Sequence, residues 1–387
     1  MNVKLMHPST GFLALLCILG IIAAGCVPIP ATVAPSDVPP SAASPTPAPA
    51  AAPAPSAAPT TAAGAHWPTE GWRTSTPEAQ GMDSQKLAEM LATIKEKNMN
   101  IHSFLVIRNG YLVSESYFRG YQQDTKHDMQ SASRSFTSTL VGIAIDKGYI
   151  DGVDHQVLEF FPERTFANLD AQKEAMTLED VLTMRSGLEW QETADTRNAQ
   201  QRSPDWVQFL LDLPVVAPPG SQWSYCSGCS HILSAILHET TGMNPRDFAE
   251  QYLFKPLHIS DVNWMVDPAG IPYGAGGFDL TPRDMAKLGY LFLRNGQWDG
   301  QQIVSSEWVK KATQRYAGVD EHFGYGYHWF TVTSLGGYAG YAALGTGGQI
   351  ILVVPELDLV IVTTARTEES IFELIDRYVI PAVQKSQ

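Results

Sequence analysis

The sequence contains no run of basic residues. Its 26 lysines and arginines are outnumbered by 40 aspartates and glutamates, so the formal net charge at pH 7 is −14. A surface of this charge repels phosphate groups, which argues against nucleic acid or an anionic membrane surface as a partner. The 387 residues are 44% hydrophobic and suffice for one large domain or two medium ones. No internal repeat is present.

Other absences narrow the chemistry. No Gly-x-Ser-x-Gly sequence occurs, which excludes the nucleophile elbow of α/β-hydrolases. The segment Gly345–Gly348 lacks the full dinucleotide fingerprint and leads into an expected strand, so it is not interpreted as a nucleotide loop. The acidic residues are scattered and are interpreted as surface groups. His231 and His238 lie seven apart on one expected helix and are interpreted as packed or surface histidines. The sequence therefore predicts no cofactor and no metal site.

Cysteine is scarce, with four residues, and the first two lie in an expected export signal at 1–26. Lys4 supplies a positive start, and residues 11–24 form an apolar stretch that is short for a bilayer span. The residues before Cys26 are small and resemble the bacterial lipobox, in which the cysteine is lipidated. We therefore expect an exported lipoprotein anchored to the membrane at Cys26, facing the extracytoplasmic side. An ordinary secretory signal cleaved nearby is the alternative.

Residues 27–66 are rich in proline and alanine, and a segment of this composition cannot bury enough apolar surface to fold. We predict a disordered linker that could extend on the order of 100 Å. At His66-Trp67-Pro68 the composition changes, and residues 67–387 are predicted to form one folded domain.

Within this domain, strands flank a mainly helical middle. We expect an amphipathic helix at 84–98 and a β-hairpin at 103–118 that turns at Asn109-Gly110. Helices are expected at 131–145, 177–184, 204–213, 228–241, 245–254 and 281–295. Strands are expected at 324–332, 347–354 and 357–364, before a last helix at 370–383. This order predicts an α+β fold, in which an antiparallel sheet is flanked by terminal helices and carries an inserted helical lobe.

Three segments contain candidate functional groups. Ser131 and Arg134 lie three apart on one face at the start of an otherwise apolar helix, where taken alone they are best interpreted as an N-cap and a solvent-facing arginine. Tyr225 and Ser227 lie in a loop just before the helix at 228–241. The segment 343–349 is rich in glycine, which lets the backbone come close to a substrate or another strand.

The three segments, in this order, resemble the motifs of the penicillin-recognising serine hydrolases, which are Ser-x-x-Lys, Tyr-x-Asn or Tyr-x-Ser, and a Lys-Thr-Gly or His-x-Gly strand. The nearest branch is the class C β-lactamase-like family, with its family VIII esterases and 6-aminohexanoate-dimer hydrolases. Residues 182–190 and 276–287 also resemble this family. The resemblance covers roughly residues 70–385 and implies a β-lactamase/transpeptidase-like fold.

The resemblance implies a role for each matching residue. Ser131 would be the nucleophile that forms an acyl-enzyme, and Tyr225 would be the general base and acid. Ser227, Gly345, Thr346 and Gly347 would bind the substrate. The backbone N–H groups of Ser131 and of the Gly345–Gly348 segment, with Thr346 preferred, would form the oxyanion hole. We therefore predict a serine hydrolase that acts on small-molecule or peptide-like esters or amides.

Arg134 departs from the family pattern, because it stands where the motif has lysine. No lysine of the chain has a serine three residues before it, so no other Ser-x-x-Lys is available. Arginine stays protonated and cannot accept a proton from the nucleophile. A phenol, with a pKa of about 10, is a weak base at neutral pH, but an adjacent cation favours the phenolate. Our hypothesis is that Tyr225 is the only base and that Arg134 activates it. The alternative is a non-catalytic binding relative.

The third segment departs as well, because residues 343–349 contain neither lysine nor histidine. In the family a cation there helps to hold the carboxylate of β-lactams and peptides. Its absence argues against a β-lactamase or a D-Ala-D-Ala peptidase, which remain alternatives, and favours substrates without that carboxylate.

Cys226 and Cys229 form an unusual Cys-x-x-Cys within the second motif. Outside the cytoplasm a disulfide is expected, and it would stiffen the loop that holds Tyr225. Free thiols remain an equal alternative. A zinc site with His231 is disfavoured because no fourth ligand is evident, and haem attachment is disfavoured because Ser230 precedes the histidine.

Overall fold

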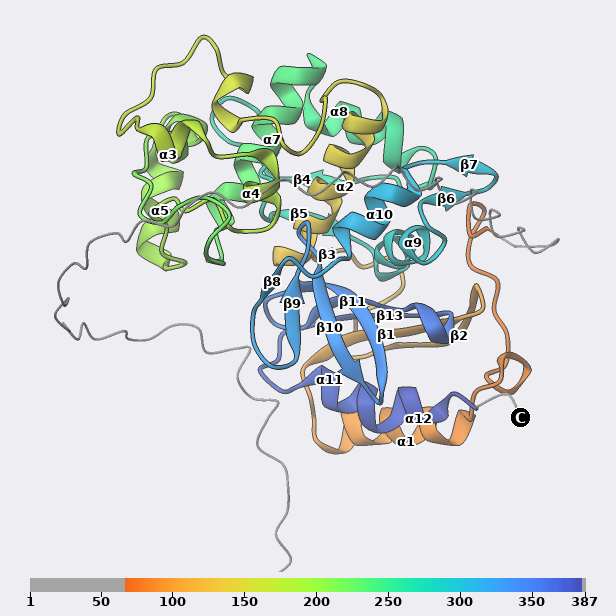
Figure 1. Cartoon of the computed structure of the whole chain (residues 1–387). Helices are drawn as coiled ribbons and strands as arrows, with labels where there is room; N and C mark the ends of the chain where they lie inside the picture. Colours follow the sequence, from red (N-terminus) through yellow and green to blue (C-terminus); the bar gives the residue numbers. More distant parts are fainter. Residues whose placement is uncertain (1–66, 385–387) are drawn as a thin grey trace, which may run out of the picture. The chain divides into compact units, whose positions relative to one another are not determined.

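A computed structural model of the chain describes residues 67–384 (Figure 1). The predicted signal peptide, the lipidation site at Cys26 and the predicted linker lie outside the described residues, so these predictions stay predictions. Within the described range, none of the helices has both the length and the apolar character that crossing a lipid bilayer requires.

An eight-stranded antiparallel sheet forms the centre of the described part, with the strand order β2-β1-β13-β12-β11-β10-β9-β8. Its strands are β1 (Ile101–Arg108), β2 (Tyr111–Tyr117), β8 (Ala317–Gly318), β9 (Phe323–Tyr325), β10 (Phe330–Leu335), β11 (Tyr338–Gly345), β12 (Gln349–Val354) and β13 (Leu359–Ala365). Short strands form two small sheets elsewhere: β3 (His127–Asp128), β4 (Asn263–Trp264), β5 (Phe278–Leu280), β6 (Gln297–Trp298) and β7 (Gln301–Gln302).

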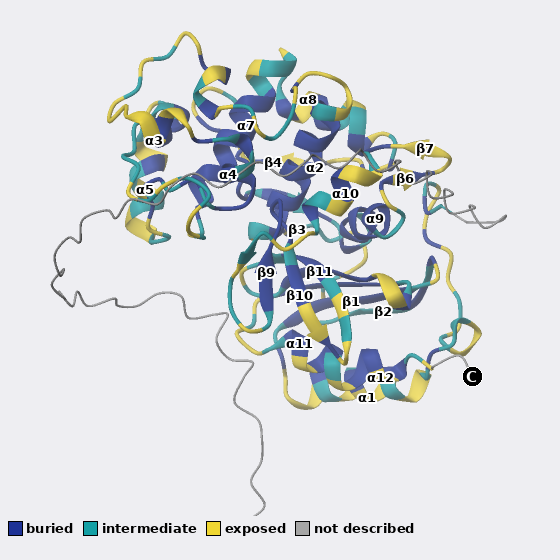
Figure 2. Cartoon of the chain, viewed as in Figure 1, coloured by how far each residue is buried: buried dark blue, intermediate teal, exposed yellow. Residues whose placement is uncertain are grey.

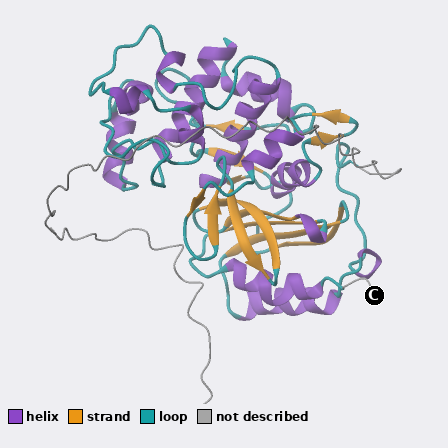
Figure 3. Ribbon diagram, viewed as in Figure 1, coloured by secondary structure: helices purple, strands orange, loops and turns teal. Residues whose placement is uncertain are grey.

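Helices cover both faces of the large sheet (Figures 1 and 3). On one face lie α1 (Ser84–Glu96), α11 (Ile371–Leu374), α12 (Ile380–Ala382) and the π-helical turn η7 (Ile375–Val379). On the other face α9 (Pro282–Leu293) packs on β12 and β13, where Gly289 allows close contact with Ile351 and Val360. Strands buried on both faces read as nearly continuous apolar runs, as the Ile350–Val354 segment does.

The helical lobe is inserted between β2 and β8. It contains α2 (Ser133–Asp146), α3 (Ala171–Glu174), α4 (Leu178–Leu182), α5 (Ala194–Arg202), α6 (Trp206–Leu211), α7 (Ser227–Thr241), α8 (Pro245–Ala249), α10 (Ser306–Ala312) and several short turns: η3 (Gln130–Ala132), η4 (Val157–Phe160) and η5 (Glu250–Phe254). Side chains accept hydrogen bonds from the free backbone N–H groups at helix starts: Thr177 and Asp180 form a capping box at α4, and Thr281 caps α9.

Two hydrophobic clusters stabilise this arrangement, one on each side of the sheet (Figure 2). Strand β1 contributes to both because its side chains alternate: Leu105 and Ile107 belong to the larger cluster, and Phe104 and Val106 to the smaller one. In α2, every residue from Ser133 to Ala144 is buried. The helix that begins two residues after the candidate nucleophile is therefore fixed on all sides by packing.

The predicted α+β fold is confirmed, whereas two local expectations were wrong and one strand was missed. The strand expected at 324–332 is divided between β9 and β10 by a turn at residues 326–329, where His328 has a left-handed φ of 57°. Strand β11 was not predicted. The acidic residues are not all on the surface, because Asp180 and Asp267 are buried.

Candidate active site

Ser131 lies in the short turn η3, directly before α2. The turn is fixed at its start: Met129 donates its N–H to the carbonyl of Phe278, and Gln130 donates its N–H to Asp128 Oδ1 at 2.9 Å. Gln130 adopts a left-handed φ of 49°, which turns the chain sharply just before the serine. Ser131 is partly exposed, whereas the residues that follow it are buried. The hydroxyl is therefore placed on a rigid support.

Arg134 is the side chain that joins the first and second motifs. It is only 2% exposed, so the solvent-facing interpretation is wrong. Its Nη1 donates to the Tyr225 hydroxyl and its Nη2 to Ser227 Oγ, both at 2.6 Å. The guanidinium carbon lies 4.8 Å from the centre of the Tyr225 ring. Arg134, which lies one helical turn after Ser131, thus contacts two residues that follow it by 91 and 93 positions in the sequence, Tyr225 and Ser227.

The loop that carries Tyr225 is held at the start of α7. A disulfide joins Cys226 and Cys229, and Cys226 Sγ also accepts the N–H of Cys229 as the N-cap of the helix. Ser227 is the first helical residue, and Tyr225 precedes the cap. Both cysteines are therefore engaged with one another. Within residues 67–384, no three histidine, cysteine, aspartate or glutamate side chains are grouped so that they could hold a metal ion.

The third motif lies against the η3 turn, which carries the candidate nucleophile Ser131. Gly345 ends β11, and a Cβ atom built on it would lie 2.3 Å from the carbonyl oxygen of Met129 and 3.1 Å from Gln130 Cβ. Only glycine allows this approach. Gly347 has a left-handed φ of 84°, and Gln349 Nε2 donates to the carbonyls of Ala365 and Thr346, which fixes the turn between β11 and β12. The three motifs predicted from the sequence are thus brought together.

Glu192 completes the arrangement, and sequence reasoning missed it. Its two oxygens accept four hydrogen bonds, from Ser227 N and Oγ, Trp190 Nε1 and Arg197 Nη1, at 2.6–3.0 Å. Burial acts to raise the pKa of Glu192, but the hydrogen bonds from Ser227 and Trp190 and the charge of Arg134 outweigh it and lower the pKa. Glu192 therefore remains ionised. Its position two residues after the family-like segment 182–190 was the available signal.

The groups around Arg134 keep its guanidinium protonated. Burial acts to lower the pKa of Arg134, but Tyr225, Tyr325 and other nearby oxygen groups outweigh this effect and raise it. His328 is 2% exposed, and burial together with the charge of Arg134 lowers its pKa to about 3. Burial raises the pKa of Tyr273 to about 12. At neutral pH the site therefore contains the Arg134 cation and the Glu192 carboxylate, beside a neutral His328 imidazole and a neutral Tyr273 phenol.

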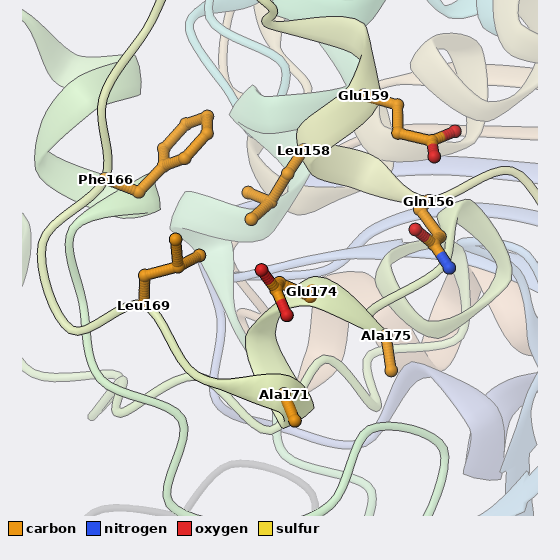
Figure 4. A pocket seen from close by; sticks show the side chains of 8 residues that line it. All are labelled: Gln156, Leu158, Glu159, Phe166, Leu169, Ala171, Glu174 and Ala175. Carbon is orange, nitrogen blue, oxygen red and sulfur yellow. The ribbon is translucent and has the colours of Figure 1, made fainter.

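Two other features of the described residues lie apart from this chemistry. A hollow of about 520 Å³ is lined by residues of η4, α3 and the loop between them, among them Leu158, Phe166 and Leu169 (Figure 4), and it contains none of the residues predicted for the site. His231 is buried in α7, where its Nε2 lies 3.0 Å from Asp267 Oδ2. The histidine is thus a packed one, as the sequence indicated.

The sequence is similar to known proteins over most of the described residues. The family model described as Beta-lactamase matches residues 79–383. A 6-aminohexanoate-dimer hydrolase of Paenarthrobacter ureafaciens is 28% identical over 283 residues, which span 67% of this chain and 71% of that protein. Penicillin-binding protein 4 of Amycolatopsis lactamdurans is 25% identical over 268 residues, spanning 60% and 70% of the two chains.

Solved structures share the fold at low sequence identity. A family VIII carboxylesterase superimposes with a TM-score of 0.64 at 14% identity, covering 79% of this chain and 99% of its own. A penicillin-binding protein homologue from Caulobacter crescentus gives a TM-score of 0.63 at 16% identity, covering 79% and 97%. The β-lactamase/transpeptidase-like architecture is therefore shared across most of the described residues.

Proposed function

Because this chain belongs to the β-lactamase family of serine hydrolases, we propose that it hydrolyses ester or amide bonds through an acyl-enzyme on Ser131. The observation that carries the proposal is the pair of hydrogen bonds from Arg134 to Tyr225 and Ser227. They join the Tyr225 phenol and the Ser227 hydroxyl to a side chain that lies three residues after Ser131, at the start of α2.

In the proposed reaction, Ser131 Oγ attacks the substrate carbonyl while Tyr225 takes the hydroxyl proton. The bond between Oγ and the carbonyl carbon forms, and Tyr225 then returns the proton to the leaving alcohol or amine as the ester or amide bond of the substrate breaks. In the second half of the reaction Tyr225 takes a proton from water, and the water oxygen attacks the acyl carbonyl carbon. Tyr225 then returns the proton to Ser131 Oγ as its bond to the acyl group breaks, which releases the carboxylic acid product. The N–H groups of Ser131 and Thr346 stabilise the oxyanion.

Arg134 would support this chemistry without exchanging a proton. Its charge beside the phenol favours the phenolate that must receive the proton from Ser131. Because both terminal nitrogens of Arg134 are engaged by Tyr225 and Ser227, the guanidinium is committed to the catalytic groups. It is therefore a poor candidate for binding a substrate carboxylate.

We infer that the substrates are esters or amides without a carboxylate at the position that β-lactams and cell-wall peptides use. Neither lysine nor histidine occurs at 343–349, and Arg134 is already paired. The names of the 6-aminohexanoate-dimer hydrolase from Paenarthrobacter ureafaciens and of the family VIII carboxylesterase support ester or amide hydrolysis as the class of reaction. β-Lactam hydrolysis and D-Ala-D-Ala peptidase activity are the alternatives within the family.

A non-catalytic binding protein is the second candidate, and one observation favours it: an arginine stands where the family motif has its proton-accepting lysine. Such a protein would bind an ester, amide or cell-wall peptide without turning it over.

The deciding experiment is covalent labelling with a fluorophosphonate, followed by peptide mass spectrometry. We expect the label on Ser131, together with hydrolysis of p-nitrophenyl butyrate that Ser131→Ala abolishes. Equal ester turnover by the wild type and Ser131→Ala would refute the enzyme proposal. Fast nitrocefin hydrolysis would instead support the β-lactamase alternative.

We also propose that the protein is exported and held at the membrane by a lipid on Cys26, on the strength of the lipobox-like residues before it. Cys26→Ala should move the protein from the membrane fraction to the soluble fraction. An unchanged membrane fraction would contradict the lipid anchor.

A further inference from the structure

The Glu192 carboxylate lies behind the catalytic groups and links three separate segments. It follows Trp190, precedes α5, and accepts the backbone N–H of Ser227, which is the first residue of α7. It also accepts the Ser227 hydroxyl at 2.6 Å. The positive end of a helix dipole favours a carboxylate at this place. Glu192 therefore fixes both the backbone and the side chain of Ser227.

Ser227 passes this constraint on to Arg134. The hydroxyl donates its proton to Glu192, so its oxygen is left to accept from Arg134 Nη2. A guanidinium is a flat fork, and its two terminal nitrogens move together. Holding Nη2 on Ser227 therefore sets the direction of Nη1, which donates to Tyr225. Without the hydrogen bond to Ser227, the guanidinium can rotate about the Arg134 side chain and lose its contact with the Tyr225 hydroxyl.

The burial of these groups makes the hold strong. Arg134 and Ser227 are 2% and 3% exposed, and the Glu192 side chain is 24% exposed. Hydrogen bonds to charged groups in a poorly solvated site are shorter and stronger than neutral ones. Glu192 is also fixed from behind by Trp190 Nε1 at 2.7 Å and Arg197 Nη1 at 2.9 Å. A carboxylate with four donors has one well-defined position.

We propose that Glu192 is a positioning residue for the reaction: it locks Ser227, and through Ser227 it aims the Arg134 guanidinium at the Tyr225 hydroxyl. The inference deepens the proposed function and rests on it. Glu192 touches neither Ser131 nor the reacting bond in this scheme, and it exchanges no proton. Its contribution is the orientation of Arg134, the cation that donates to the proposed base Tyr225.

The test compares Glu192→Ala and Glu192→Gln with the wild type, using p-nitrophenyl butyrate. Loss of the carboxylate should lower kcat by about 100-fold, because a shift of about 1 Å at a catalytic group costs this much, and should leave KM nearly unchanged. Glu192→Gln keeps an oxygen that can accept from Ser227, so its loss of kcat should be smaller. The pH dependence of kcat/KM is a further measurement, which should stay unchanged if the role of Glu192 is purely structural.

In Glu192→Ala the acidic limb of kcat/KM should shift to higher pH, because the Arg134 charge is no longer held beside the hydroxyl of the proposed base Tyr225. Thr193→Ala is the matched control. It removes the N-cap of α5 beside Glu192, where Thr193 Oγ1 accepts the N–H of Thr196, without touching the catalytic groups. This control should lower Tm and leave both kcat and the acidic limb unchanged. Glu192→Ala behaving like Thr193→Ala would overturn the proposal.

A second measurement keeps this test independent of turnover. Tyrosine ionisation is followed at 295 nm, and the step that is missing in Tyr225→Phe is assigned to Tyr225. In Glu192→Ala that step should occur at higher pH than in the wild type. If it does not move, Glu192 does not position the cation, whether or not the protein is an enzyme. If it moves while Ser131→Ala matches the wild type in ester turnover, the positioning role stands and the proposed hydrolysis fails.

Discussion

Gly345→Ala should impair Ser131, the proposed nucleophile, without changing any side chain that is proposed to take part in the reaction. Gly345 has no left-handed φ, so alanine is compatible with its backbone conformation. The obstacle is space. The added methyl carbon would lie 2.3 Å from the Met129 carbonyl oxygen, whereas ordinary contacts of this kind begin at 3.4 Å. The turn that carries Ser131 and the end of β11 must therefore separate by about 1 Å.

The size of the effect follows from this displacement. Inserting a methyl group into a packed site costs about 1–3 kcal/mol of stability. The rate should suffer more, because a shift of about 1 Å between the serine and the oxyanion-binding N–H groups costs about 100-fold in kcat. The two motifs would separate where Gly345 contacts Met129, so the hydroxyl and the proposed Thr346 N–H would no longer act on one carbonyl.

The assay measures kcat for p-nitrophenyl butyrate, the rate of fluorophosphonate labelling at Ser131, and Tm. Gly340→Ala is the matched control, because Gly340 lies in the same strand and its added methyl would also meet a carbonyl oxygen, that of Val353 at 2.7 Å. That contact is in the sheet and away from the nucleophile turn. The control should lose stability and keep its labelling rate.

The result that would refute this reasoning is a folded Gly345→Ala protein whose kcat and labelling rate stay within threefold of the wild type. It would mean that the approach of β11 to the η3 turn does not set the position of the nucleophile.

Three further predictions concern neighbouring groups. Arg134→Lys introduces an amine that can accept a proton, and ester turnover should rise, whereas Arg134→Met should reduce it; steady-state kinetics measures both. His328 has a pKa of about 3, below the ordinary value of about 6.5 for an unfolded chain. Its stabilising contribution is therefore complete above pH 6.5 and is lost as the pH falls, by about 3 kcal/mol at pH 4. Urea unfolding of His328→Asn, which tolerates the left-handed φ, should show a weaker pH dependence. Replacing Cys226 and Cys229 by serine should cost about 2 kcal/mol of stability and lower kcat; unchanged Tm and kcat would show that the disulfide has no role.

Much of the fold could be predicted because local signals agree with tertiary packing. The helix at 84–98 is found as α1, where Asp83 supplies the N-cap, and the Asn109-Gly110 turn joins β1 to β2. In these segments the hydrophobic period, the turn residues and the caps all favour one structure. The order of strands and helices then suffices for the α+β architecture.

The parts that were missed depend on contacts that the local sequence does not encode. Strand β11 (Tyr338–Gly345) is rich in alanine and glycine, which have low strand propensity, and its neighbours β10 and β12 determine it. Glu192 looks like any surface glutamate, because its partners lie before it at Trp190 and far along the chain at Ser227. The motifs identified the catalytic candidates, whereas Glu192, which holds Ser227 in place, could be found only from the structure.

The pairing of β1 with β13 affects how the chain must fold. Ile101 lies opposite Ala365, so the middle of the large sheet joins the beginning of the described chain to its end. Asp83 and Ala382 are likewise joined by a backbone hydrogen bond at 2.8 Å. Until β13 is available, β1 can pair only with β2, and the eight-stranded sheet cannot form. Such long-range pairings slow folding, so removing the C-terminal strand should prevent the native sheet from forming and leave β1 open to aggregation.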